Sequence, residues 1–274
     1  MSDKLRIGVM MSLGSDIREE IKKVRELGLD NCQLACWSPE HYNDESLAAV
    51  KGATKEFGVE ITSLWTGYPG EAQWNFTQGP ATIGLVPPGT REMRVKALIV
   101  GAEFAAKLGV ASATTHAGFI PENPNDPLYA GTVEALAKIA KRARDLGLSF
   151  CFETGQETPI TLLRVMTDIG TGNLGINFDP ANLLMYGKAN PVDALDILGP
   201  YVKGVHAKDG EYPTKPGELG VEKPLGEGRV NFPVFVSKLK SFGYKGALTI
   251  EREISGPQQT ADIEKGIAFL KPLC

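Results

Sequence analysis

The sequence lacks the signatures of several large protein classes. Its four cysteines form no CxxC pair, so nothing points to a disulfide framework and we expect reduced, structural thiols. No apolar run approaches the roughly 20 residues that a membrane span needs. The chain also lacks the GxGxxG and GxxxxGKS/T motifs, which disfavours nucleotide binding and an open, doubly wound sheet.

An excess of positive charge is absent as well. The formal net charge is −4, so no basic field is available to attract nucleic acid or an anionic membrane. The N-terminal stretch up to Asp16 has a short apolar run and no small-residue cleavage site, which is not the pattern of a signal peptide. We therefore expect a cytoplasmic protein without a nucleic-acid or membrane partner.

What the sequence does contain is a regular alternation of short apolar runs and amphipathic stretches. An apolar run at 5–11 is followed by an amphipathic stretch at 16–27, which ends at Gly28 as helices often do. The same cycle recurs along the whole chain. The predicted strands are 5–11, 31–36, 60–65, 111–116, 148–153, 174–179, 202–207 and 247–251, and the predicted helices are 16–27, 44–57, 90–108, 127–146, 159–169, 191–199, 231–242 and 258–271.

These eight strand–helix units predict the fold class. Strands that alternate with helices pair in parallel through right-handed crossovers. No break in composition separates the units, and a chain of 274 residues is close to the length of about 250 that a (β/α)8 barrel needs. We predict an α/β protein that forms a single (β/α)8 TIM barrel domain over residues 1–274.

Four polar residues stand at the ends of successive predicted strands. They are Glu153, Asp179, His206 and Glu251, in the segments FCFE, INFD, GVHA and LTIE. Because side chains alternate along a strand, the bulky residue before each of them should face the helices and the polar residue should face the barrel axis. Barrel enzymes place their catalytic residues at this end of the strands.

Such a cluster predicts a metal site. Three carboxylates at one point repel one another unless a cation lies among them or some of them are protonated. Oxygen ligands with one imidazole favour Mn²⁺ or Mg²⁺, with Co²⁺ and Zn²⁺ as alternatives. A single carboxylate at a strand end is usually just solvated, but four polar residues in successive units favour the metal interpretation, and we take Mn²⁺ as the first choice.

The segments FETGQETP, INFDPANL, VHAKDG, LGEGRVNF and LTIERE resemble, in this order, the xylose isomerase-like barrel superfamily. Within it the sequence is similar to the sugar (phosphate) isomerases and epimerases, which include ketose 3-epimerases and inosose dehydratase-like proteins. The resemblance implies that Glu153, Asp179, His206 and Glu251 bind one divalent metal. It further implies that Glu153 and Glu251 are the acid/base pair on opposite faces of the substrate.

The chemistry implied is metal-dependent isomerisation or epimerisation of a keto-sugar or a sugar derivative. A proton next to a ketone is abstracted, the metal holds the oxygens of a cis-enediolate, and a carboxyl group returns a proton. This reaction is redox-neutral and needs no nucleotide cofactor, which agrees with the missing glycine fingerprint. The expected partner is a small-molecule sugar, and the resemblance implies a homodimer or a homotetramer.

Aromatic and basic residues near the strand ends are candidates for substrate binding. His116 ends the fourth predicted strand, where a histidine of the superfamily contacts the substrate or a second metal; a structural histidine is the alternative. Lys208 belongs to an HxKD segment that recurs in the family. Trp37, Trp65 and Trp74 follow the second and third strands, where an indole can stack on a sugar or pack in a loop, and Trp65 is the preferred candidate.

Three further residues are candidates for substrate binding, and each can also be interpreted in another way. Glu157 could bond a sugar hydroxyl or cap the helix that follows. Arg229 could clamp a hydroxyl, carboxylate or phosphate, or lie on the surface. Asn182 stands where several ketose 3-epimerases carry a substrate-holding histidine, which puts that narrower label in doubt.

Other activities remain as alternatives or are disfavoured. An inosose dehydratase-like lyase would use the same proton abstraction, and a non-catalytic sugar-binding barrel would not need Glu153 and Glu251 to flank a metal. The related endonuclease IV type uses about three zinc ions and several extra histidines, but this chain has only three histidines. No glycine-rich phosphate loop is evident after the last two strands, so an unphosphorylated substrate is favoured.

Overall fold

The computed structural model describes residues 4–14 and 16–274. Eight parallel strands close into a barrel in the order β1-β10-β7-β6-β5-β4-β3-β2, which confirms the predicted (β/α)8 fold. Each barrel strand has bounds within one residue of the prediction. They are β1 (Arg6–Ser12), β2 (Asn31–Cys36), β3 (Glu60–Thr66), β4 (Ser112–Thr115), β5 (Ser149–Glu153), β6 (Leu174–Phe178), β7 (Val202–Ala207) and β10 (Ala247–Ile250).

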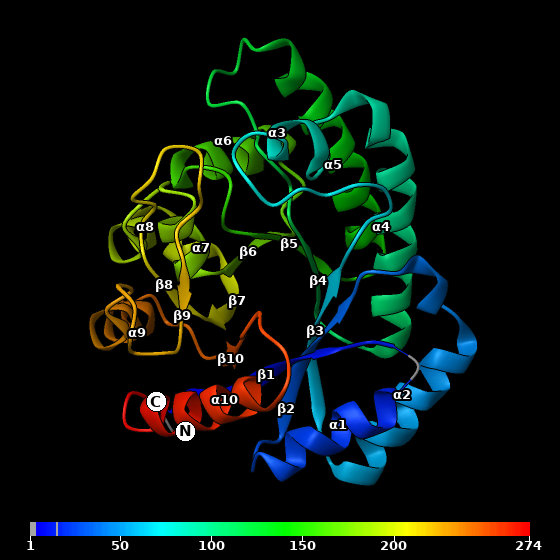
Figure 1. Ribbon diagram of the computed structural model, residues 1–274. Coiled ribbons are helices and arrows are strands. Elements are labelled where there is room, and N and C mark those ends of the chain that lie inside the picture. The colour runs from blue at the N-terminus through cyan, green and yellow to red at the C-terminus, as the bar shows by residue number, and fades with distance from the viewer. Residues whose placement is uncertain (1–3, 15) are drawn as a thin grey trace.

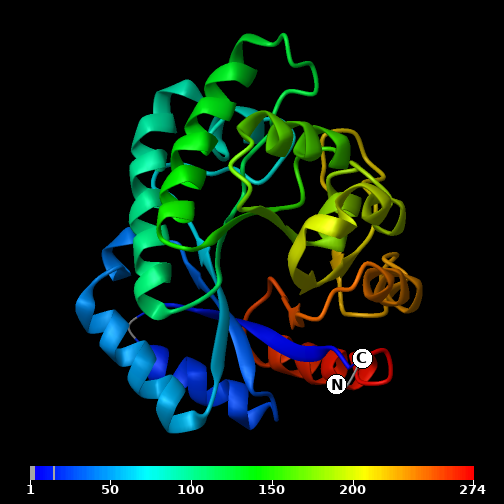
Figure 2. The ribbon, with the colours of Figure 1, turned by 180° about the vertical axis from the view of Figure 1, so that it is seen from behind.

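The helices surround the strands, as Figures 1 and 2 show from opposite sides. Those predicted from the sequence are α1 (Ile17–Glu26), α2 (Asp44–Phe57), α4 (Pro88–Leu108), α5 (Pro127–Asp145), α6 (Pro159–Ile169), α8 (Pro191–Leu198), α9 (Phe232–Ser241) and α10 (Pro257–Leu270). Short elements that were not predicted are η1 (Pro39–His41), α3 (Gly79–Thr82), α7 (Pro180–Met185), η2 (Gly199–Tyr201), β8 (Asp209–Gly210) and β9 (Glu222–Lys223). None of the described helices is long and apolar enough to cross a membrane.

Local signals explain where the helices begin and end. The side chain of Thr158 accepts a hydrogen bond from the backbone of Thr161 at the start of α6, and Asn190 caps α8 in the same way. Gly58 and Gly109 end α2 and α4 in the left-handed conformation that glycine adopts without strain. These stops return the chain to the bottom of the barrel after each helix.

Side chains on the strands alternate between the helices and the barrel axis, as expected. Phe178 packs against Phe235 of α9, with ring centroids 5.4 Å apart, so it faces outward. On the axis, the Gln33 side-chain amide donates a hydrogen bond to Asn177 Oδ1 at 3.1 Å. The barrel interior is therefore partly polar just below the carboxyl ends of the strands.

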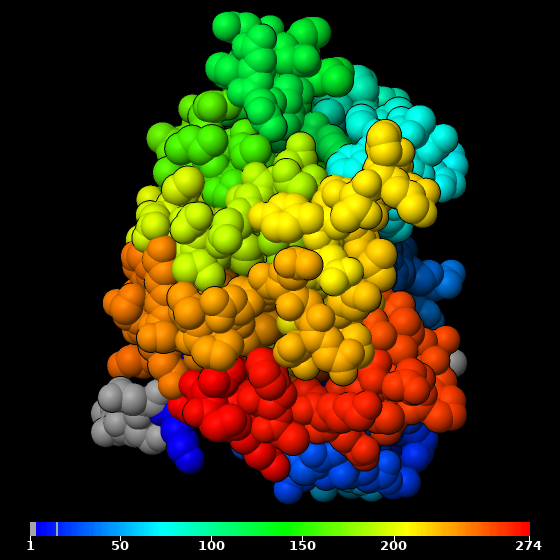
Figure 3. Space-filling model, turned by 60° about the vertical axis from the view of Figure 1, so that its left-hand side comes forward, coloured from blue at the N-terminus to red at the C-terminus, as the bar shows by residue number. Residues whose placement is uncertain are grey.

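The segment 210–229 between β7 and α9 is folded back on the barrel by one buried carboxylate. Asp209 accepts hydrogen bonds from the backbone N–H groups of Gly210, Gly226, Gly228 and Val230 at 2.9–3.1 Å. Gly228 permits this approach, because a Cβ there would lie 2.1 Å from Asp209 Oδ1. In Figure 3 the segment, coloured yellow to light orange, lies on the surface next to the red helix α10.

The four cysteines are unpaired, and three of them are buried. This is the state expected from the sequence. Residues 1–3 and 15 of the N-terminal stretch, which lacks the pattern of a signal peptide, lie outside the described residues.

Candidate metal centre

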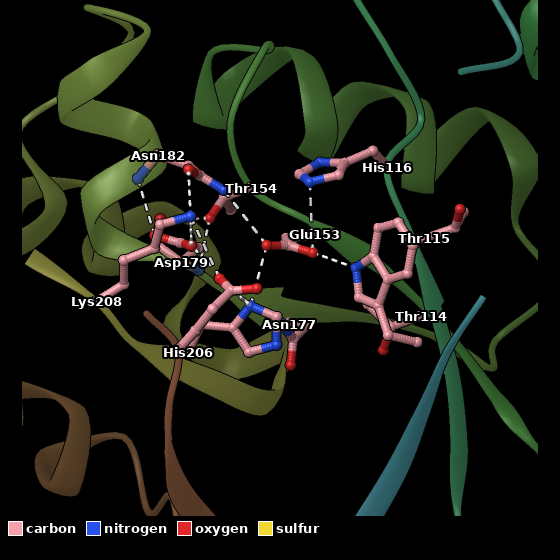
Figure 4. A network of polar contacts seen from close by, with 12 residues as sticks. Thr114, Thr115, His116, Glu153, Thr154, Asn177, Asp179, Asn182, His206 and Lys208 are labelled. Atoms are coloured by element: carbon pink, nitrogen blue, oxygen red, sulfur yellow. Dashed lines mark hydrogen bonds and ion pairs between the residues drawn. The ribbon is translucent and has the colours of Figure 1, made fainter. Parts of the chain in front are cut away.

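Four strand ends bring the predicted ligands together at the top of the barrel. Glu153 is the last residue of β5, Asp179 follows β6, His206 lies near the end of β7, and Glu251 follows β10. One ligand atom from each of them lies within 4.8 Å of the others. Glu153, Asp179 and His206 are buried, and the Glu251 side chain is 16% exposed. Figure 4 shows Glu153, Asp179 and His206 converging.

The imidazole of His206 is at the middle of the cluster. Its Nδ1 lies 3.0 Å from Glu153 Oε1 and 3.3 Å from Glu251 Oε2. Its Nε2 lies 3.1 Å from the side-chain oxygen of Gln33. When Nε2–H donates to Gln33, the Nδ1 lone pair faces the carboxylates and is free to bind a metal, the usual arrangement of a ligating histidine.

Asp179 uses its two carboxylate oxygens differently. Oδ1 accepts a hydrogen bond of 2.8 Å from the backbone N–H of Asn182 and caps α7. Oδ2 is buried without a hydrogen-bond partner and lies 4.0 Å from His206 Nδ1. Because an unpartnered buried carboxylate oxygen costs several kcal/mol, this atom is well suited to bind a cation. The donor set of three carboxylates and one imidazole fits a divalent ion.

Crowding of charge shifts the pKa values in the expected directions. Burial, together with Glu251 and Glu153, raises the pKa of Asp179 well above its usual value. Burial also acts to raise the pKa of Glu251, but Lys208 and His206 outweigh it and hold that pKa below its usual value. Burial lowers the pKa of His206, but Glu153 and Glu251 outweigh it and raise that pKa. The cluster is therefore under electrostatic strain that a cation would relieve.

Lys208, the residue after β7, belongs to the same cluster. Its ammonium group is fully buried and lies 2.9 Å from Glu253 and 3.3 Å from Glu251. Asp179 Oδ2 lies 3.7 Å away, and the side-chain oxygen of Asn182 accepts a hydrogen bond from Lys208 at 3.3 Å. The structure thus brings the candidates Lys208 and Asn182 into contact with the predicted ligands.

Glu153 is held from several directions. The indole Nε1 of Trp65 donates a hydrogen bond to its Oε2, and His116 Nε2 lies 3.4 Å from the same oxygen. The Asn182 amide donates to Oε1 at 3.3 Å. Burial acts to raise the pKa of Glu153, but His116 and His206 outweigh it and lower that pKa. Trp65 and His116, both sequence candidates, therefore lie directly beside the candidate metal ligands, as Figure 4 shows for His116.

A cavity of about 420 Å³ opens above the cluster, a volume typical of small-molecule sites. Its wall includes seven of the sequence candidates, namely Trp37, Trp65, Trp74, His116, Glu153, Asn182 and Glu251. The cavity is therefore large enough for a small molecule and adjoins the candidate metal ligands.

Three of the substrate-binding candidates, Lys208, Glu157 and Arg229, do not line this wall, and of these only Lys208 contacts the predicted ligands. Glu157 is buried, and burial raises its pKa to about 8, although its own backbone N–H and Lys188 act to lower that pKa. Arg229 is exposed and lines a separate outer groove with Lys215 and Tyr212. The reason is the Asp209 anchor, which fixes the neighbouring backbone and leaves the Arg229 side chain on the outside.

Gln156, Arg252 and Glu253, which were not predicted from the sequence, also line the cavity. Gln156 is 1% exposed, and neither atom of its amide has a hydrogen-bond partner. Its amide lies near the Tyr186 hydroxyl, whose pKa is raised by burial and lowered by Gln156. Its place three residues after Glu153 was the available signal, because the loops that follow barrel strands line the active site.

The comparisons with known proteins agree with this geometry. The family model described as "Xylose isomerase-like TIM barrel" matches residues 21–273. A crystal structure of a xylose isomerase domain protein from Planctomyces limnophilus is 32% identical, covers 98% of this chain and 97% of that chain, and has a TM-score of 0.92.

Two curated proteins are more distant. The uncharacterized protein MJ1311 of Methanocaldococcus jannaschii is 24% identical over 91% of this chain and 84% of its own length. The D-psicose 3-epimerase of Agrobacterium fabrum is 23% identical over 84% of this chain and 77% of its own length. The similarity extends over most of each of these chains.

Proposed function

The chain belongs to the xylose isomerase-like TIM barrel family, and we propose that it is a divalent-metal-dependent isomerase or epimerase of a keto-sugar or sugar derivative. The observation that carries this proposal is the convergence of Glu153, Asp179, His206 and Glu251 at the floor of a sugar-sized cavity. The similarity to a D-psicose 3-epimerase supports the same class of reaction.

The four clustered residues would hold the metal, and we propose Mn²⁺ because the donors combine hard oxygens with one nitrogen. Asp179 Oδ2, which has no hydrogen-bond partner, and His206 Nδ1, which faces the carboxylates of Glu153 and Glu251, support this assignment. When bound, a divalent cation would stabilise the negative charge that develops on the sugar oxygens.

The proton transfers are assigned to Glu153 and Glu251. Both line the cavity, and the lowered pKa of each favours the carboxylate form that accepts a proton from the carbon next to the carbonyl. Return of a proton to the same carbon from the opposite face gives an epimer. Return to the neighbouring carbon, with a proton shift between the two oxygens, gives an aldose–ketose pair.

A lyase is the second candidate, because Lys208 places a cation 3.3 Å from Glu251. Elimination of water requires an acid that protonates the departing hydroxyl. Burial acts to lower the pKa of Lys208, but Glu251 and Glu253 outweigh it and raise that pKa. A lysine that keeps its proton suits hydrogen bonding to a sugar oxygen better than acid catalysis, so we prefer the isomerase or epimerase.

Solvent exchange tests the proposal. The Mn²⁺-loaded protein is incubated in D₂O with a panel of ketoses, inososes and 3-keto-sugars, and each sugar is then analysed by mass spectrometry and NMR. Deuterium at a carbon next to the carbonyl, lost on chelation, is the expected result, and the product separates epimerase, isomerase and dehydratase. Absence of exchange across the panel with metal bound would contradict the proposal and favour a sugar-binding barrel.

A further inference from the structure

All three tryptophans of the chain lie on one wall of the cavity. The ring centroids of Trp37 and Trp65 are 4.4 Å apart, and those of Trp37 and Trp74 are 5.9 Å apart. Trp74 also contacts His116, at 5.0 Å between centroids. These three indoles form a continuous surface, here called the aromatic wall, which runs from the candidate metal ligands to the mouth of the cavity.

The aromatic wall has a buried end and an exposed end. Trp65 is 4% exposed and donates its N–H to Glu153, so it lies at the level of the reacting atoms. Trp37 is 49% exposed and lies one indole farther out. A single sugar ring that reacts beside Glu153 and packs on Trp65 would leave the face of Trp37 uncovered.

The position of Trp37 is built into the backbone. A Cβ at Gly67 would lie 2.8 Å from both Cα and Cε3 of Trp37. Only glycine therefore allows the chain after β3 to pass this close to the indole. Because a large exposed aromatic side chain at a cavity mouth offers an apolar face to a ligand, the arrangement points to a ring that stacks there.

The charges of the cavity indicate that this ligand is uncharged. Among the described residues of the cavity wall, Arg252 is the one lysine or arginine, and its guanidinium is paired with Asp262 at 2.9 Å and Glu222 at 3.0 Å. Lys208, which is buried and does not line the cavity, is paired with Glu251 and Glu253. A phosphate or carboxylate would therefore meet cations that are already neutralised, beside several carboxylates.

We propose that the substrate is an uncharged keto-sugar joined to a second ring, glycosyl or aryl, and that this second ring stacks on Trp37 while the keto-sugar reacts beside Glu153. The inference rests on the proposed function, which it deepens by naming the substrate class. A sugar ring offers a flat C–H face and an aryl group a π face, and both stack on an indole.

Intrinsic fluorescence gives a direct test, because every tryptophan of the chain reports on the aromatic wall. The Mg²⁺-loaded protein is titrated with pairs of ligands that differ by one ring. Fructose is compared with 6-O-glucosyl-fructose, and 3-keto-glucose is compared with phenyl 3-keto-glucoside. We expect the two-ring ligand of at least one pair to bind about three- to tenfold more tightly, and the pair that responds distinguishes a glycosyl from an aryl group.

Variants of Trp37 then test whether this residue causes the tighter binding of the two-ring ligands. In Trp37→Ala the ratio of the two affinities should fall toward one, and in Trp37→Phe it should be largely retained. Tyr212→Ala, which removes another exposed aromatic side chain away from the cavity wall, should leave the ratio unchanged. Equal affinities in the native protein, an unchanged ratio in Trp37→Ala, or tighter binding of fructose 6-phosphate than of fructose would overturn the inference.

The same ligands in D₂O separate this inference from the proposed function. Exchange of one-ring and two-ring sugars with equal affinity would overturn the inference and leave the enzyme assignment intact. A Trp37-dependent preference for two rings without any exchange would overturn the enzyme assignment and leave the stacking site intact. Failure of every ligand to bind would overturn the inference.

Discussion

Trp65 on β3 donates its indole N–H to Glu153 on β5, across 88 residues of sequence. The bond holds Oε2 of this carboxylate on the side of the aromatic wall. Oε1 meanwhile faces His206 Nδ1 at 3.0 Å and the Asn182 amide at 3.3 Å. The carboxylate of Glu153 is therefore oriented by contacts from β3, β7 and α7, the kind of fixed geometry that preorganised catalysis would use.

This bond can be removed without removing the ring. In Trp65→Phe the indole N–H is lost and most of the packing remains, so Glu153 should become less well oriented. We expect kcat for solvent exchange to fall about tenfold, the order of effect of one lost orienting hydrogen bond. Wild-type kcat in this variant, measured on the best exchanging sugar, would show that the bond has no catalytic role.

Glu251→Gln tests the acid/base pair. The amide keeps the shape of the side chain but cannot accept the proton, so exchange should fall by about 10²- to 10⁴-fold while the thermal transition by circular dichroism stays cooperative. Glu253→Gln is the matched control, because Glu253 also pairs with Lys208 but its side chain is 59% exposed. Full activity of Glu251→Gln, or an equal loss in the control, would contradict the assignment.

Asp179→Asn should raise the stability of the metal-free protein and lower the stability that Mn²⁺ adds. Burial raises the pKa of Asp179, so its charged form destabilises the metal-free fold at neutral pH. Asparagine can still cap α7 through its oxygen, and we expect the variant to be more stable than wild type in EDTA, because it removes the charge that burial disfavours. It should also lose the rise in Tm that Mn²⁺ causes in the wild type. A lower Tm in EDTA would show that the carboxylate stabilises the fold by itself.

The buried carboxyl group of Glu157 should make the free energy of unfolding depend on pH. Burial raises its pKa from 4.5 to about 8, so between these values the folded protein binds a proton that the unfolded chain has released. The free energy of unfolding should therefore decrease as pH rises through this window, with Glu157 contributing up to about 1.4 kcal/mol per pH unit.

Chemical denaturation at several pH values between 5 and 8 measures this contribution. Glu157→Gln mimics the protonated form, so its stability should fall less steeply across the window than that of the wild type. Parallel curves for the two proteins would contradict the account.

Much of the barrel fold and the positions of the four candidate ligands could be predicted, because they depend on patterns that are local in the sequence. The apolar runs and the glycine stops at Gly28 and Gly58 define strand and helix bounds, and alternation along a strand decides which side Glu153 faces. The four ligands end successive strands, so the barrel topology alone brings them together.

What could not be predicted depends on contacts between distant segments. Arg229 follows a glycine-rich turn that could have pointed into the cavity, and the four backbone bonds to Asp209 decide that it does not. The position of Trp37 in the aromatic wall depends on its close approach to Gly67, which lies thirty positions later in the chain. Neither contact leaves a periodic signal in the sequence.

The most direct test of the central claim is a Mn²⁺ titration followed by electron paramagnetic resonance. Free Mn²⁺ gives a strong signal that is lost on binding, so the metal-free protein should suppress the signal until about one Mn²⁺ per chain has been added. His206→Ala and Asp179→Asn should abolish this suppression, whereas Arg229→Ala, outside the cavity, should retain it. A free Mn²⁺ signal that rises from the first addition, as it does in buffer, would contradict the assignment of these four residues as a metal centre.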